Sequence, residues 1–166
     1  MDLLVEPAGW AHWGAQRLRC AVGKGGVRAT KREGDGATPA GAFVMRRLLY
    51  RPDRGIAPIT RLPMAPIAND DGWCDDPTDV AYNRPVKLPY RARAERLWRD
   101  DRLYDLLVVL GYNDDPAIAG AGSAIFLHVA AADYTPTEGC VALAPDDLRR
   151  VMAEADTTSR VVVAAT

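Results

Sequence analysis

The distribution of proline is the feature that most restricts how this chain can fold. Residues 51–89 contain seven of its 12 prolines, at positions 52, 58, 63, 66, 77, 85 and 89. Proline has no N–H donor and a fixed φ, so it is excluded from helix interiors and from the centres of sheets. This part of the chain is therefore expected to form short strands and loops, without long helices.

The rest of the sequence is mostly typical of β-structure. In residues 16–22, Leu18, Cys20 and Val22 alternate with other residues, which is the pattern of a half-buried strand. The almost wholly apolar run at 104–112 predicts a central strand buried on both faces. Four further strands are expected, at 3–5, 42–50, 123–130 and 160–165.

Two short helices and one prominent loop complete the expected pattern. Residues 92–100 predict a short helix, and a second helix is expected at 145–155, where Pro145 is followed by two aspartates that favour a helix N-terminus. Residues 31–41 (KREGDGATPAG) are rich in turn formers and predict an ordered surface loop. A mainly β fold, a β-rich α+β domain with a few short helices, is expected to span residues 1–166 as one unit.

The charge and hydropathy of the chain argue against several partners. The net charge is −1, so neither nucleic acid nor an anionic membrane surface is an expected partner. No apolar run approaches the ~20 residues of a membrane span. The first ten residues, MDLLVEPAGW, do not have the pattern of a signal peptide. The sequence leaves open whether the protein stays in the cytosol or has lost a targeting segment.

Three cysteines, Cys20, Cys74 and Cys140, are an odd number at wide spacing, and no C-x-x-C motif occurs. A zinc site is therefore not expected. A disulfide between Cys20 and Cys74 stays open, whereas Cys74 alone is expected to be a packed thiol.

Residues 128–143, HVAAADYTPTEGCVAL, combine the groups that a cysteine nucleophile needs. Such a nucleophile requires a base for its proton and donors for an oxyanion. A return of the chain through the loop could bring the His128 ring beside the Cys140 sulfur, and Gly139 allows a close approach of the backbone. The alternative is a buried, inert thiol, because free cysteine is among the most buried residue types.

Two blocks of the sequence resemble the YkuD-type L,D-transpeptidases. IFLHV (125–129) followed by TEGCVAL (137–143) is similar to the active-site signature of that family, and KREGDGATPAGAF (31–43) is similar to its G-D-x-x-T-P-x-G-x-F stretch. The blocks occur in the family's order. The resemblance implies a catalytic domain built on a mixed β-sheet barrel or sandwich.

The resemblance also assigns roles to residues. Cys140 would be the nucleophile, His128 its base, and the amides of Gly139 and Cys140 the oxyanion donors. Thr137 matches a Ser/Thr position. Two positions depart from the family: many members have His where this chain has Glu138, and Arg or Asn where it has Ala142.

The implied activity is a cysteine-dependent L,D-transpeptidase acting on peptidoglycan stem peptides as donor and acceptor. It would proceed through a thioester without metal or organic cofactor, in the periplasm or cell envelope, and carbapenems would acylate the cysteine. The alternatives are an L,D-carboxypeptidase or amidase on the same scaffold and a non-catalytic peptidoglycan-binding module. Within residues 72–86, Trp73, Tyr82 and Asn83 could contact the substrate or pack a small loop core.

Overall fold

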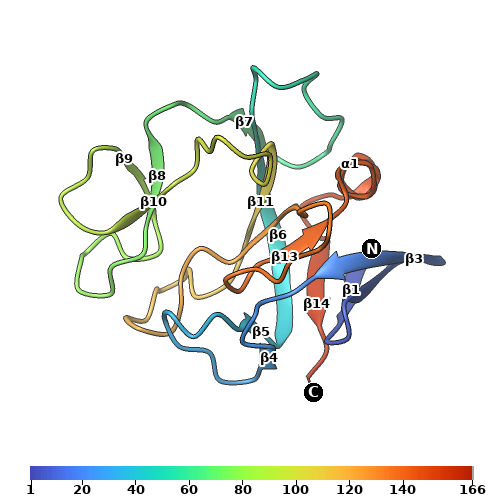
Figure 1. Ribbon diagram of the computed structural model, residues 1–166, viewed down its shortest axis with the longest axis horizontal. Coiled ribbons are helices and arrows are strands. Elements are labelled where there is room, and N and C mark those ends of the chain that lie inside the picture. Colours follow the sequence, from blue (N-terminus) through green and yellow to red (C-terminus); the bar gives the residue numbers. More distant parts are fainter. Residues whose placement is uncertain (166) are drawn as a thin grey trace.

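The computed structural model describes residues 1–165 and is built around one sheet that closes on itself (Figure 1). Its strands follow the order β11-β12-β13-β3-β2-β1-β14-β6, and β6 pairs back with β11. Strand β7 pairs with the part of β6 that β14 does not reach. The strands are β1 (Asp2–Glu6), β2 (Trp10–Trp13), β3 (Gln16–Ala21), β6 (Gly41–Tyr50), β7 (Met64–Pro66), β11 (Leu106–Leu110), β12 (Phe126–Val129), β13 (Val141–Leu143) and β14 (Arg160–Val163). The mainly β fold expected from the sequence is thus confirmed.

Strand alternation divides the apolar side chains between two cores. In β11, Leu106 and Val108 lie in the main core inside the closed sheet, whereas Leu107 and Val109 lie in a second core on its outer face. All residues of β11 are buried, as the apolar run predicts. The outer core is therefore a second buried layer next to the sheet.

A small sheet covers that outer layer. It has the order β10-β8-β9, with β8 (Asp71–Cys74), β9 (Pro85–Lys87) and β10 (Ala94–Arg96), and lies at the left of Figure 1. Trp73 of β8 packs edge-to-face on Phe126 of β12, with ring centroids 5.1 Å apart.

The helix expected at 92–100 was wrong. Residues Ala94–Arg96 pair antiparallel with β8, and Leu97 is buried in the outer core. Pairing and burial supplied by distant residues override the local preference for a helix. Within residues 1–165 the chain forms a single α-helix, α1 (Pro145–Glu154), which begins at the expected proline and packs on the main core. It is too short to cross a membrane.

The segment 31–41 is only partly the surface loop that its turn formers predict. It leads into β5 (Thr38–Pro39), which pairs with β4 (Val27–Arg28). Lys31, Ala37 and Thr38 are buried. The loop therefore packs into the molecule and contributes side chains to the site described below.

Candidate active site

The parallel pairing of β12 with β13 places Cys140 and His128 on the same face of the sheet. Leu127 pairs with Val141, and both point into the main core. Because side chains alternate along a strand, His128 and Cys140 both point to the outer face. This geometry is produced by the strand, the loop and the return strand that the sequence predicts.

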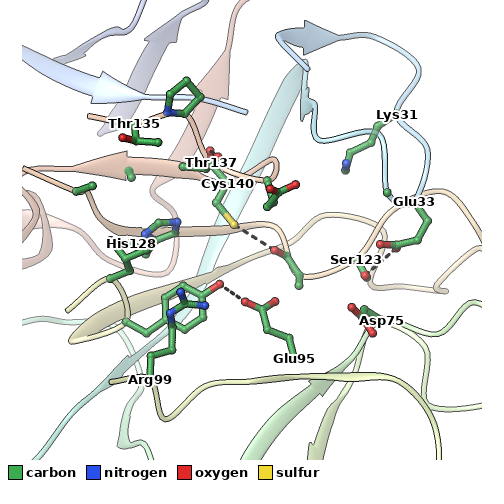
Figure 2. A pocket seen from close by; sticks show the side chains of 18 of the residues that line it. Lys31, Glu33, Asp75, Glu95, Arg99, Ser123, His128, Thr135, Thr137 and Cys140 are labelled. Carbon is green, nitrogen blue, oxygen red and sulfur yellow. Dashed lines mark hydrogen bonds between the residues drawn. The ribbon is translucent and has the colours of Figure 1, made fainter. Parts of the chain in front are cut away.

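A cavity of about 610 Å³ opens over this face, and both Cys140 and His128 line it (Figure 2). The opposite wall comes from the small sheet and the segment after it. The loop 31–41 and the turn before β12 close a third side. The charged and polar side chains from these segments are Lys31, Glu33, Asp75, Arg93, Glu95, Arg99, Tyr104 and Ser123.

The thiol of Cys140 is held between two backbone groups. It donates to the carbonyl oxygen of Ala124 at 3.2 Å and accepts from the N–H of Phe126 at 3.3 Å. Burial raises the pKa of Cys140 from 9.0 to about 12, and the carboxylate of Glu95 adds to this, against the N–H of Phe126 and the nearby cation of Lys31. The resting group at neutral pH is therefore a thiol.

The imidazole of His128 is also neutral at rest. Burial lowers its pKa from 6.5 to about 4, more than the carbonyl of Val129 raises it. Its Nδ1 lies 2.8 Å from the carbonyl oxygen of Val129, which can only accept, so Nδ1 carries the proton. Nε2 is left with a free lone pair and can accept a proton.

A buried Glu–Tyr pair supports the imidazole from the side of the small sheet. The ring of Tyr104 meets that of His128 edge-on, with centroids 5.2 Å apart, and its hydroxyl donates to the Glu95 carboxylate. Burial raises the pKa of Glu95 above its usual range. A neutral thiol, a neutral imidazole and a buried carboxyl group therefore share one cavity, an arrangement suited to proton transfer coupled to nucleophilic attack.

The comparison with protein families decides the classification. A family model described as YkuD, L,D-transpeptidase catalytic domain, matches residues 11–163. The chain belongs to this family.

Two solved structures are similar to the chain at low identity. An L,D-transpeptidase from Mycobacterium smegmatis shares 11% identity at a TM-score of 0.45, covering 99% of this chain and 58% of that one. The helical cell shape determining protein Pgp2 from Campylobacter jejuni shares 13% at a TM-score of 0.45, covering 98% and 46%. The chain thus spans about half the length of these proteins. A comparison with curated proteins found no match.

In this L,D-transpeptidase domain the two candidate oxyanion donors differ. The Gly139 N–H donates to Thr137 Oγ1 at 3.1 Å, and the Thr137 hydroxyl donates to the Cys140 carbonyl at 2.6 Å. The Gly139 amide is therefore occupied by Thr137, and its donation to an oxyanion stays a prediction. Within residues 1–165 the Cys140 N–H has no acceptor and is available. Thr137 thus holds the backbone next to Cys140.

Glu138 lies at the rim of the same cavity. Its side chain is 78% exposed and pairs with Lys24 at 2.7 Å. The carboxylate that raises the pKa of Cys140 is that of Glu95, which the sequence did not single out. Glu95 falls in the segment expected to be helical, so its approach to the sulfur could not be inferred.

Trp73, Tyr82 and Asn83 pack the insert and are absent from the lining of the Cys140 cavity. Their burial agrees with the small loop core, and contact with a substrate stays a prediction. Asn83 Oδ1 accepts from the indole N–H of Trp73 at 2.9 Å and from the N–H of Ala124 at 3.0 Å. Since Ala124 accepts the thiol hydrogen, Asn83 helps to position Cys140.

The cysteines other than Cys140 lie outside the cavity. Cys20 and Cys74 are buried and free, so the structure has no disulfide between them. Cys74 is completely buried, as expected for a packed thiol.

Proposed function

We propose that this chain is a cysteine-dependent L,D-transpeptidase that acts on peptidoglycan stem peptides through a thioester. Family membership over residues 11–163 supports the reaction class. The observation that carries the proposal is the pair formed by a protonated thiol and an imidazole with a free Nε2 in one cavity.

In the acylation step, Cys140 Sγ attacks the carbonyl carbon of the residue before a terminal D-Ala. The thiol hydrogen turns from the Ala124 carbonyl and passes to His128 Nε2 as the C–S bond forms. The carbonyl oxygen becomes an oxyanion, for which the Cys140 N–H is a donor. The imidazolium then returns the proton to the leaving nitrogen, the C–N bond breaks, and D-Ala departs from the thioester.

In the second step an amine of another stem peptide attacks the thioester carbonyl. His128 Nε2 takes a proton from this amine, and the sulfur leaves as a thiolate that recovers the proton from the imidazolium. The product is a new amide and the resting thiol. Water in place of the amine would give hydrolysis, so the nature of the acceptor decides between transferase and carboxypeptidase.

The first test is incubation with a carbapenem followed by intact-mass measurement. We expect a covalent adduct on the wild-type protein, no adduct on Cys140→Ala and a slowed reaction of His128→Ala. Cys74→Ala is the matched control, because this buried thiol lies outside the cavity and its loss should leave the adduct unchanged. Absence of an adduct on the wild-type protein would favour a non-catalytic module.

The second test uses a stem tetrapeptide ending in D-Ala, with and without a stem-peptide amine acceptor. A cross-linked product that requires Cys140 would establish transfer. Release of D-Ala with only the shortened peptide as product, even at high acceptor concentration, would instead establish a hydrolase.

A further inference from the structure

A buried lysine lies on the wall of the cavity close to the nucleophile. Lys31 is only 8% exposed, yet it lines the cavity, and its amine points inward from the loop 31–41 (Figure 2). Lysine is almost never buried to this extent without a partner. Its partner is Asp35, whose carboxylate lies 2.8 Å from Nζ.

Two glycines from distant parts of the chain make room for this side chain. A β-carbon at Gly122 would lie 2.8 Å from Lys31 Cε, and one at Gly139 would lie 3.4 Å from Nζ and 2.8 Å from the carbonyl oxygen of Ala37. Both glycines have positive φ, at 106° and 136°. The ammonium is thereby brought to the residue that precedes Cys140.

The ammonium also has hydrogen-bonding capacity to spare. Of its three N–H groups, one donates to Asp35, and the only other acceptor within residues 1–165 is the Arg32 carbonyl oxygen at a long 3.4 Å. The acidic groups of the cavity are held by other partners: Glu33 by Tyr82 and Ser123, Asp75 by Arg93, Glu95 by Tyr104 and Glu138 by Lys24. At least one N–H of Lys31 is therefore available to an anionic ligand.

We propose that Lys31 determines specificity by binding the free carboxylate of the residue that leaves, an inference that rests on the proposed function above. The carboxylate carbon of that residue is three bonds from the scissile carbonyl carbon, a span of about 3 to 4 Å. An ammonium beside Gly139 therefore contacts this carboxylate when the scissile carbonyl carbon lies at Cys140 Sγ. The enzyme then accepts a chain-terminal leaving residue and rejects an internal peptide bond, which offers no anion at this place.

The test compares two peptides: a stem tetrapeptide ending in D-Ala and the same peptide with a C-terminal carboxamide. The readout is kcat/KM for release of D-alanine or D-alaninamide. We expect wild-type protein to prefer the acid by about 10- to 100-fold, the effect of one charge-assisted hydrogen bond. In Lys31→Met this preference should fall to about 1 through slower reaction of the acid, and Lys31→Arg should retain most of it.

Lys87→Met is the matched control, because Lys87 pairs with Asp70 and Asp71, which do not line the cavity, and it should keep the wild-type preference. A preference that persists in Lys31→Met, with both substrates slowed alike, would overturn the inference and leave the proposed function intact. A wild-type preference near 1 would also overturn the inference and leave the proposed function intact. This result needs no variant, so it would hold even if Lys31→Met failed to fold. Release from neither peptide by the wild-type protein would remove the proposed function as well.

Discussion

The ionisation of Cys140 is the property that most directly tests the neutral Cys–His pair. Its pKa is raised from 9.0 to about 12, because the thiol is buried and faces the Glu95 carboxylate. This difference corresponds to roughly 4 kcal/mol against the thiolate. At pH 9 an unperturbed thiol would be half ionised, whereas Cys140 should be ionised to only about one part in a thousand.

The assay is a pH titration of the far-ultraviolet absorbance of thiolate, recorded as the difference between wild-type protein and Cys140→Ala. The subtraction removes Cys20 and Cys74, which are also buried. We expect no thiolate signal from Cys140 between pH 5 and 9. A full signal near neutral pH would mean that the resting state is a thiolate paired with protonated His128. The proposed proton transfer from Cys140 to His128 during the attack would then be wrong, because the proton would already lie on the imidazole.

Three further outcomes follow from the same contacts. Glu95→Gln removes the carboxylate that opposes the thiolate, so in this titration the Cys140 signal should appear at lower pH; an unchanged curve would show that this charge does not act on the sulfur. His128 has a pKa of about 4 in the folded protein and 6.5 in the unfolded chain. Between pH 4 and 6.5 only the unfolded chain binds this proton. The free energy of unfolding should therefore fall by up to about 3 kcal/mol as the pH drops from 6.5 to 4. Urea unfolding should show that His128→Gln lacks this part of the pH dependence, and equal slopes would contradict it. Thr137→Val should slow carbapenem acylation by about 10- to 100-fold, because the Gly139 N–H and the Cys140 carbonyl lose their hydroxyl partner. Thr137→Ser keeps the hydroxyl and should stay near wild type. Equal rates for all three proteins would exclude the role of the hydroxyl.

The strands could be predicted from the sequence because their signals are local. The apolar run at 104–112 became β11, buried on both faces, and the alternation at 16–22 became β3. The neighbourhood of Cys140 and His128 could also be anticipated, since the parallel pairing of β12 with β13 needs only the loop between them.

The remaining parts of the site depend on contacts between distant segments. Glu95 was hidden because its segment has a helical composition but pairs with β8, 20 or more residues earlier in the chain. Lys31 stands in a segment rich in turn formers, and its burial depends on the absence of side chains at Gly122 and Gly139. No local pattern records either arrangement.

Asn83 shows how a residue outside the lining of the cavity can influence the thiol of Cys140. Ala124 has φ of +52°, a conformation that costs a non-glycine residue energy and needs support from its surroundings. Asn83 supplies that support: it accepts from the Ala124 N–H and donates to two carbonyls, of Tyr112 and Asn113, at 3.0 and 2.7 Å. The Ala124 carbonyl held in this way receives the thiol hydrogen of Cys140. The position of the thiol therefore depends on the packing of the small sheet. In the proposed mechanism, a change in that sheet would act on acylation through the direction of one S–H bond.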